Sequence, residues 1–320
     1  MAESRFFPKV SIIIPVYNGA NFLELAINCA LAQTYKNIEI IVVNDGSNDN
    51  GETAKTAKAF GQRIVYLEKE NGGVSSALNL GIEKMSGEYF SWLSHDDEYA
   101  PGKIETQVKM LERLGYTDYS TIAYTNVRFI DVDSKALKDN DSHLTPDKRY
   151  SGREMIEYTF RHGVLGGCGL LIPKKAFDDC GGFDENLRYS QDALMFYKFF
   201  LKDYGVVCDG EWNVMYRLHA NQTSKTKHEL FYRDADYIAR ILAPEFAKTD
   251  NTGTYLYRYA ARHAKYGCRG VVEICTEISA DKAKSFSLFQ RMKLSLILFY
   301  SRFRDSIKNL YYRLFLKVKV

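Results

Sequence analysis

The stretch IIIPVYNGANFLELAINCALAQTYKNIEIIVVNDGSNDN, residues 12–50, decides the fold. The β-branched run 10–14 ends at Pro15, residues 22–33 carry apolar side chains at helical spacing, and a second apolar run follows at 38–43. Strands that read as unbroken apolar runs are typically buried on both faces. This strand–helix–strand order therefore predicts a parallel sheet covered by helices.

The same alternation continues through the first hundred residues. Further strands are predicted at 64–67 and 89–93, and further helices from about 50 to 60, at 74–85 and from Pro101 onward. From about Thr121 the pattern becomes mixed, with a strand-like piece at 122–130, and helices resume near His228. We predict an α/β fold, with a mixed, mainly parallel sheet flanked by helices over 1–225 and a helical C-terminal region over 226–320.

Composition narrows the classes of protein that fit. The chain has 320 residues, of which 46% are hydrophobic and 26% charged, and its formal net charge of +3 gives no argument for nucleic-acid binding. We find no export signal at its start and no run of about 20 apolar residues that would span a bilayer. The six cysteines form no CxxC pair, so we expect reduced thiols in a cytoplasmic protein.

Four polar loops follow the predicted strands, and in parallel sheets ligands bind at this edge. They are 15–18, 44–47, 68–73 and 94–97. A dinucleotide-binding dehydrogenase is excluded, because neither G-x-G-x-x-G nor a P-loop follows the first strand.

The side chains in these loops suit a nucleotide and a cation. Tyr17 can stack on a nucleobase, and Asp45 can accept a hydrogen bond from a base N–H. Asp96 and Asp97 can hold a divalent cation that bridges two phosphates, because hard cations prefer carboxylate oxygen.

The segment 12–50, followed by NGGVSSALNLGI (71–82) and LSHDDEYAP (93–101), resembles the family 2 glycosyltransferases of the GT-A fold. The resemblance covers about residues 8–225 and rests on several motifs in order. It implies transfer of a sugar from a nucleoside diphosphate donor, with UDP- or dTDP-sugars favoured, and inversion at the anomeric carbon.

The resemblance also assigns the donor site. Tyr17 matches the aromatic that stacks on the base, with Pro15 beside it, and Asp45 matches the carboxylate that contacts the base. Asn18 and Asn79 complete this predicted donor site. The arginine that usually precedes the helical asparagine is Leu78 here, so one positive charge facing the diphosphate is missing.

The metal motif departs from the family pattern. Asp-x-Asp-Asp is replaced by Ser94-His95-Asp96-Asp97, so the leading carboxylate is lost. We predict that Asp96 makes the main contact with Mn²⁺ or Mg²⁺ and with the donor, and that Asp97 is the second metal ligand. His95 is interpreted as structural.

The catalytic base is predicted in RYSQDALMFYKF, residues 188–199. The family's Glu-Asp pair is Gln191-Asp192 here, which makes Asp192 the candidate base for the acceptor hydroxyl. Further along, MYRLHANQTS (215–224) resembles the R-x-H segment, in which His219 would contact the diphosphate or the metal and Arg217 would offset the charge of the leaving group.

Each assignment has a simpler structural alternative. Asp45 and Asp192 can merely cap helices, Tyr17 can be plain packing, Asp96 and Asp97 can lie in a solvated turn, and His219 can be a structural histidine.

The C-terminal tail, 285–320, carries eight lysines and arginines against one aspartate. At about 100° per residue, eight apolar side chains share an arc of roughly 80°. They are Phe289, Met292, Leu296, Phe299, Phe303, Ile307, Leu310 and Leu314. This pattern predicts peripheral binding to an anionic membrane on the inner face. Packing on the catalytic domain or on a second copy remains the alternative.

The sequence thus predicts an inverting glycosyltransferase that acts on a glycan or lipid-linked acceptor in bacterial surface polysaccharide synthesis. A nucleotidyltransferase is the enzymatic alternative, although a triphosphate loop rich in Gly and Lys or Arg is absent after the first strand. A non-catalytic sugar-nucleotide-binding protein is the other alternative. The sequence leaves an oligomer open and gives no argument for a nucleic-acid partner.

Overall fold

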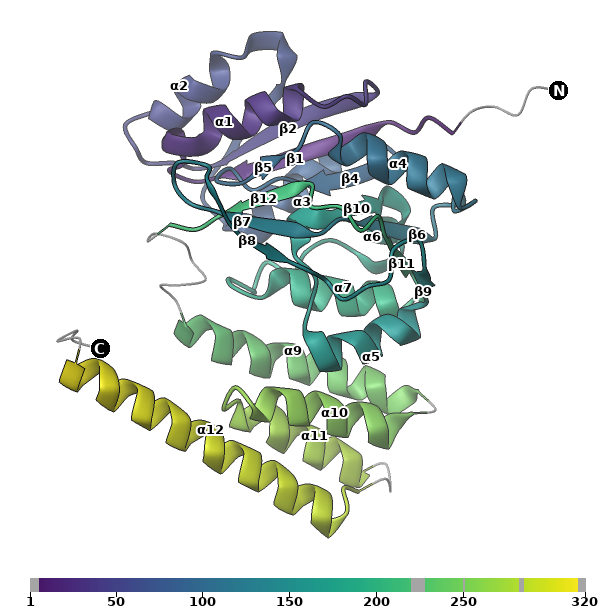
Figure 1. Cartoon of the computed structure of the whole chain (residues 1–320), viewed down its shortest axis with the longest axis vertical. Coiled ribbons are helices and arrows are strands. Elements are labelled where there is room, and N and C mark those ends of the chain that lie inside the picture. Colours follow the sequence, from purple (N-terminus) through teal and green to yellow (C-terminus); the bar gives the residue numbers. More distant parts are fainter. Residues whose placement is uncertain (1–5, 220–227, 250, 282–284, 316–320) are drawn as a thin grey trace. The chain divides into compact units, whose positions relative to one another are not determined.

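The structure, a computed structural model, describes residues 6–219, 228–249, 251–281 and 285–315 (Figure 1). It divides into two compact units, Met1–Thr226 and Lys227–Val320. The first unit contains the sheets and the second is helical in its described part.

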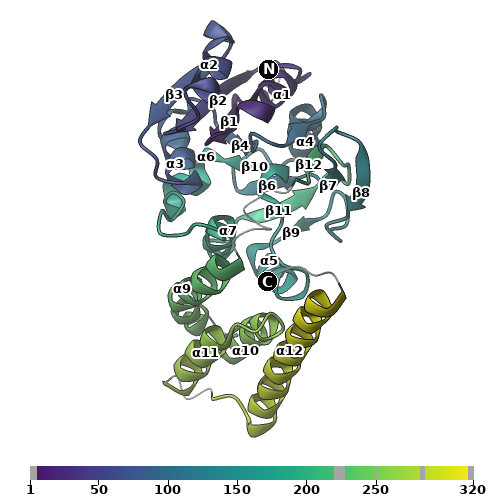
Figure 2. The same cartoon turned by 90° about the vertical axis from the view of Figure 1, so that its left-hand side faces the viewer.

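An eight-stranded sheet forms the core of the first unit (Figure 2). Its strands, in spatial order, are β3 (Val65–Lys69), β2 (Ile38–Asp45), β1 (Val10–Val16), β4 (Tyr89–Trp92), β10 (Leu170–Pro173), β6 (Thr121–Tyr124), β11 (Gly205–Cys208) and β9 (Arg149–Tyr150). The four strands from the first hundred residues are parallel, β10 runs antiparallel to both of its neighbours, and β11 is parallel to β6. The predicted mixed, mainly parallel α/β fold is confirmed.

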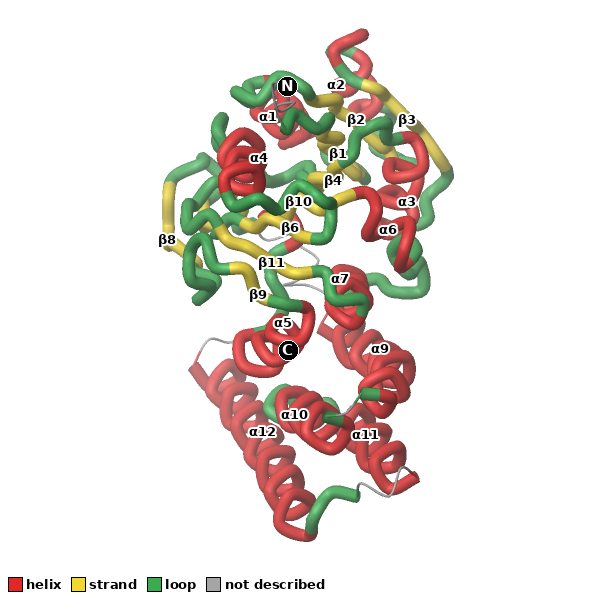
Figure 3. Tube along the Cα trace, turned by 90° about the vertical axis from the view of Figure 1, so that its right-hand side faces the viewer, coloured by secondary structure: helices red, strands yellow, loops and turns green. Residues whose placement is uncertain are grey.

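The helices of this unit lie between strands along the chain and surround the sheet (Figure 3). They are α1 (Ala20–Leu31), α2 (Glu52–Lys58), α3 (Val74–Lys84), α4 (Lys103–Arg113), α5 (Gly152–His162), α6 (Lys174–Cys180) and α7 (Gln191–Leu201). Every residue of β1 is buried, as expected for a central strand with helices on both faces.

The pairing register of β1, β2, β3 and β4 brings their carboxyl ends to one edge of the sheet, which we call the rim. Val16 at the end of β1 lies opposite Asn44, and Asn44 lies opposite Glu68. On the other side of β1, Ile13 pairs with Trp92. The loops that follow these four strands therefore leave the sheet at the same edge.

The expected strand-like piece 122–130 is two strands in two sheets. β6 ends at Tyr124, while β7 (Val127–Ile130) joins a second sheet of order β5 (Glu98–Tyr99), β12 (Val214–Arg217), β7 and β8 (Ala136–Asn140). The chain changes sheets where the Thr125 N–H donates to Gly169 O and the Asn126 N–H donates to Glu211 O. These tertiary hydrogen bonds override a continuous local pattern.

The second unit is built from α9 (His228–Lys248), α10 (Thr252–Ala264), α11 (Arg269–Asp281) and α12 (Leu288–Phe315). Helices α9, α10 and α11 pack on one another, and α12 packs on α10. Among the described residues, none of the helices is both long and apolar enough to cross a bilayer.

Candidate active site

The first rim loop is held to the second by a reciprocal pair of amides. The Asn18 Nδ2 donates to Asn48 Oδ1 at 2.7 Å, and the Asn48 N–H donates to Asn18 Oδ1 at 2.8 Å. Asn18 has a φ of 49°, a left-handed conformation that asparagine tolerates better than most residues. Tyr17 stands beside this pair with 44% of its surface exposed, so plain core packing does not account for it.

Pro15 and Asp45 lie deeper at the same edge. Pro15 is buried within β1 and shapes the strand end without offering a polar group. Asp45 is only 3% exposed and does not cap α2, whose N-cap is Gly51.

The Asp45 carboxylate is fully engaged by the loop after β3. Its Oδ1 accepts from Gly72 N at 3.0 Å and pairs with Lys69 Nζ at 3.0 Å. Its Oδ2 accepts from Gly73 N at 2.7 Å and from Asn71 Nδ2 at 3.3 Å. A carboxylate offers about four acceptor positions, so a contact with a base would have to displace one of these donors. The predicted base contact remains a prediction, while the observed role is to shape the loop.

The two adjacent carboxylates of the metal motif have different environments. Asp97 is 2% exposed, its Oδ1 accepts from Arg217 N at 3.0 Å, and its Oδ2 lies 3.4 Å from the Cys168 thiol. Burial, reinforced by the charge of Asp96, raises the pKa of Asp97 well above its usual value. Asp97 therefore links the loop after β4 to β12 and to Cys168, and its role as a second metal ligand stays a prediction.

Asp96 is paired with His219. Its Oδ2 lies 2.9 Å from His219 Nε2, and both side chains keep about a sixth of their surface exposed. The two residues are 123 positions apart and meet because β12 lies beside β5, directly after the metal motif. His219 also rests on Phe22 of α1, with 5.6 Å between ring centroids.

Arg217 holds neighbouring segments of the chain together in this structure. It is fully buried, its Nε donates to Asp96 O at 2.9 Å, and its Nη1 donates to Asp131 O and Val132 O at 3.0 Å. Its Nη2 pairs with Glu98. With these donors engaged, the predicted contact with the leaving group is not what the observed arrangement offers.

The His95 ring lies against Gly19 at the start of α1. A Cβ placed on Gly19 would come within 2.3 Å of His95 Cδ2, so the ring occupies the space left by that glycine. Burial lowers the pKa of His95 and favours a neutral ring. Ser94, in place of the lost carboxylate, lies 3.4 Å from the Cys168 sulfur.

Asn79 fixes the segment that precedes α7, and its predicted contact with the donor stays a prediction. Its Nδ2 donates to Phe183 O and Glu185 Oε1, both at 2.9 Å, and its Oδ1 accepts from Phe183 N at 2.7 Å. Nearer the rim, Ser75 Oγ contacts Leu187 O at 3.5 Å. The segment therefore runs along α3 toward the rim and begins α7 there.

Asp192 lies in the first turn of α7, whose N-cap position is Ser190. The Ala193 N–H donates to Asp192 Oδ1 at 2.9 Å, and burial raises the pKa of the carboxyl from 3.8 to about 6. A carboxylate with this pKa is charged at neutral pH and is a stronger base than an exposed aspartate.

Gln191, in place of the family's glutamate, is 8% exposed, and its Oε1 is buried without a hydrogen-bond partner within the described ranges. A glutamate would put a second charge into this same apolar position, beside Asp192.

The residues at Asp96 fit a divalent cation only in part. Among described residues, no group of three or more His, Cys, Asp and Glu side chains is arranged to hold a metal ion. Asp96 carries carboxylate oxygens and His219 an imidazole, both donor types used for Mn²⁺, and in this structure His219 Nε2 is engaged with Asp96 Oδ2. Two protein ligands leave coordination positions for phosphate oxygens and water.

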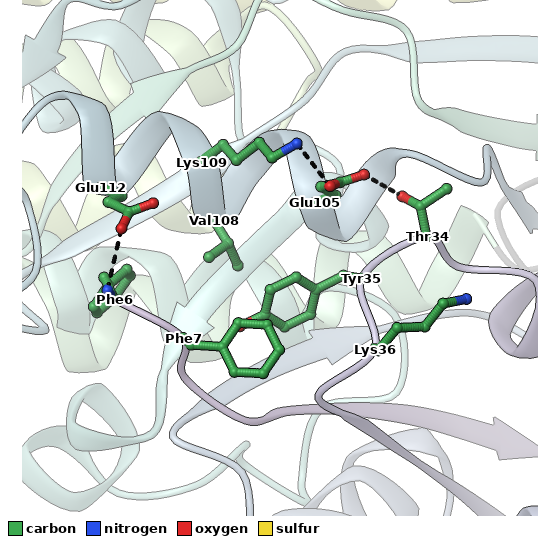
Figure 4. Close-up of a pocket in the computed structure, with 9 residues that line it drawn as sticks. All are labelled: Phe6, Phe7, Thr34, Tyr35, Lys36, Glu105, Val108, Lys109 and Glu112. Carbon is green, nitrogen blue, oxygen red and sulfur yellow. Dashed lines mark hydrogen bonds and ion pairs between the residues drawn. The ribbon is translucent and has the colours of Figure 1, made fainter. Parts of the chain in front are cut away.

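The rim thus brings Tyr17, Asn18, Asp96 and His219 to the surface and keeps Asp45, Asp97 and Arg217 as internal braces. Sequence reasoning missed Lys69, Cys168 and Arg188, which make contacts between loops and have no periodic signal. A separate hollow lies near the start of β1, away from the rim, and is lined by Phe7, Tyr35 and Glu105 among others (Figure 4).

Comparison with known proteins identifies the family of this chain. Residues 11–181 match the family described as "Glycosyl transferase family 2". A protein of Rickettsia prowazekii described as an uncharacterized glycosyltransferase is 48% identical over 229 residues, which are 71% of this chain and 69% of that protein. The Bacillus subtilis minor teichoic acid biosynthesis protein GgaB is 30% identical over 241 residues, 72% of this chain and 26% of that protein.

Solved structures share the fold. Residues 1–349 of TarS from S. aureus, in complex with UDP, align with a TM-score of 0.67 and 15% identity, covering 93% of this chain and 88% of that chain. The UDP-GlcNAc complex of the same protein aligns with a TM-score of 0.66 over the same shares.

Proposed function

Because this chain belongs to glycosyl transferase family 2 and is a glycosyltransferase, we propose that it transfers a sugar, with inversion, from a nucleoside diphosphate to a glycan or lipid-linked hydroxyl. UDP- and dTDP-sugars are the favoured donors. The observation that supports the proposal is the pairing of Asp96 with His219 at 2.9 Å at the rim, and Asp192 in the first turn of α7 is proposed to act with them.

In the proposed reaction, Asp192 takes the proton from the acceptor hydroxyl while that oxygen attacks the anomeric carbon. The bond between the anomeric carbon and the diphosphate oxygen breaks on the opposite face, and the nucleoside diphosphate leaves. Tyr17 stacks on the base and Asn18 orients the loop beside it. A divalent cation held by Asp96 and His219 would neutralise charge on the departing diphosphate.

Two similar proteins suggest where the reaction belongs. GgaB is named for teichoic acid biosynthesis, and the TarS structures are described with UDP and UDP-GlcNAc. We infer a role in bacterial surface polysaccharide synthesis on the cytoplasmic side of the membrane.

The test is release of a nucleoside diphosphate from a panel of sugar donors, with Mn²⁺ or Mg²⁺ and glycan or lipid-linked acceptors. A transferase releases the nucleoside diphosphate and forms a glycosylated product of inverted configuration. A nucleotidyltransferase would instead release pyrophosphate from a nucleoside triphosphate and a sugar phosphate. A non-catalytic protein would be stabilised against heat by the donor without turning it over.

We also propose that α12 attaches the enzyme to an anionic membrane. Its described stripe residues Phe289, Met292, Leu296, Phe299 and Phe303 are between 56% and 74% exposed, whereas Leu294 and Ser301 on another side of the helix are 2% exposed. The predicted members Ile307, Leu310 and Leu314 lie outside the described side chains. Exposed apolar area flanked by basic residues in the sequence suits the interface of an anionic bilayer.

Co-sedimentation of the full chain with vesicles tests this attachment. We expect binding to vesicles with anionic lipid, weaker binding to neutral vesicles, and loss of binding for the double substitution Leu296→Glu and Phe299→Glu. Leu137→Glu is the control, because Leu137 is 55% exposed but lies on β8. If the double variant binds as before while its oligomeric state changes, α12 joins copies of the chain instead.

A further inference from the structure

The rim carries a cation that the proposed chemistry does not yet use. Arg188 is exposed in the segment between α6 and α7, and its Nη1 donates to Gly72 O at 2.6 Å. A Cβ placed on Gly73 would lie 2.1 Å from this nitrogen, so the guanidinium rests directly on the glycine backbone. Gly73 has a φ of 88°, which also disfavours other residues there.

The contacts of the neighbouring segment hold Arg188 in this position. Asn79 fixes Phe183 in both directions, and Ser75 contacts Leu187 O immediately before the arginine. These contacts along α3 therefore position the Arg188 guanidinium at the rim.

The other cation beside this loop is already neutralised. Lys69 Nζ pairs with Asp45 Oδ1 at 3.0 Å, and that carboxylate also accepts from Gly72 N and Gly73 N. Helix α3 adds no cation over residues 74–82, and Leu78 within it is fully buried. Arg188 therefore adds a second cation beside a loop whose lysine is paired with Asp45.

We propose that Arg188 binds the phosphate groups of the nucleotide donor through its guanidinium, from the chain segment that also delivers Asp192. This inference rests on the proposed function and names a residue of the same site. A guanidinium is suited to phosphate because its N–H groups match pairs of phosphate oxygens and it keeps its charge at every physiological pH. Its link to Gly72 couples phosphate binding to the loop that Asp45 shapes.

The experiment titrates the full chain with UDP, dTDP, CDP, GDP and ADP by calorimetry in Mg²⁺. It continues with the monophosphate and the free nucleoside of the best-binding base. Variants are Arg188→Gln, Arg188→Lys and the control Arg113→Gln. Arg113 is an exposed arginine at the end of α4 that bonds Asp147 at 2.6 Å, away from the rim. Thermal unfolding verifies that each variant is folded.

We expect Arg188→Gln to weaken diphosphate binding on the order of tenfold, to weaken monophosphate binding less, and to leave the nucleoside unaffected. Arg188→Lys should fall between glutamine and wild type, and Arg113→Gln should bind as wild type. Wild-type diphosphate affinity in Arg188→Gln, or an equal loss for nucleoside and diphosphate, would overturn the proposal. A wild-type protein that binds no nucleoside diphosphate would instead contradict the proposed function.

Discussion

The two halves of the rim use the same residue type for different purposes. After β2 and β3, Asp45 receives three N–H donors and an ammonium group and is nearly inaccessible. After β4 and at the start of α7, Asp96 and Asp192 keep accessible or sparsely bonded oxygens. A carboxylate whose oxygens are all engaged stabilises a loop, whereas one with spare oxygens can bind a cation or a proton.

The same contrast appears within one dipeptide. Asp96 pairs with His219 near the surface, while Asp97 is buried against Arg217 N and Cys168. Adjacent residues of the same type are thus divided between chemistry and structure by the directions in which their side chains point.

The largest effect is expected at Asp192. Asp192→Asn should lower the rate of transfer by about 10²–10⁴-fold, because it removes the base while keeping the side-chain shape. Nucleotide affinity, measured by calorimetry, should be unchanged. Transfer at an undiminished rate would show that Asp192 is not the base and that another group takes the proton.

The raised pKa of Asp192 also predicts the pH dependence. Transfer should rise with pH until about 6 and then level, because the base must be deprotonated. Since the folded state holds this proton more tightly than the unfolded chain, the carboxyl lowers stability as pH rises from about 4 to 6. Asp192→Asn should therefore melt at a higher temperature than wild type at pH 7 and at nearly the same temperature at pH 4.

The next comparison separates Asp96 from Asp97. Asp96→Asn should reduce metal-dependent transfer on the order of 10²-fold with little change in stability, because it loses a charge near the surface. Asp97→Ala should instead lower the free energy of unfolding by about 1–3 kcal/mol, since it leaves the buried Arg217 N–H without its partner.

The control at this dipeptide is Asp97→Asn, which keeps an oxygen acceptor for Arg217 and should unfold close to wild type in urea. If substitution of Asp97 instead lowers transfer and substitution of Asp96 instead lowers stability, Asp97 is the residue of the reaction and Asp96 the structural one.

The structural half of the rim is tested at Asp45. Asp45→Ala should lower the free energy of unfolding by about 1–3 kcal/mol, because two backbone N–H groups lose their acceptor. Urea denaturation measures this, with the exposed Asp139→Ala as a control that should leave stability unchanged. A stable Asp45→Ala variant that has lost only nucleotide binding would favour the direct base contact.

The smallest effect is expected at Tyr17. Tyr17→Ala should weaken nucleotide binding about tenfold by removing the ring that stacks on the base. Tyr17→Phe should bind like wild type, because the hydroxyl makes only a 3.4 Å contact with Asn48. A loss in the phenylalanine variant equal to that in alanine would show that the hydroxyl, and not the ring, is what matters.

Much of the first unit could be predicted from sequence. The strands and helices of the first hundred residues were expected close to their observed positions, because unbroken apolar runs and helical spacing are local properties. The division of 122–130 between two sheets was not expected, since it depends on hydrogen bonds to Gly169 and Glu211, which are distant in the chain.

The candidate site was likewise predicted only in part. Motifs predicted Tyr17, Asp96, Asp192 and His219 as site residues, because residue type and position within a motif are visible in the sequence. They did not reveal that Asn79 would bond Phe183 and Glu185, or that Arg217 would be buried among carbonyl oxygens. Those outcomes depend on which partners the folded chain brings near.

The sequence by itself determined which of the first four strand-end loops reach the rim, because strand length and order fix where each loop leaves a parallel sheet. Only the tertiary structure decided which of them are saturated by partners and which are available, since hydrogen bonds across more than a hundred residues are set by packing. Arg188 shows the difference, because its chemistry is visible in the sequence but its place on Gly72 is a property of the folded chain.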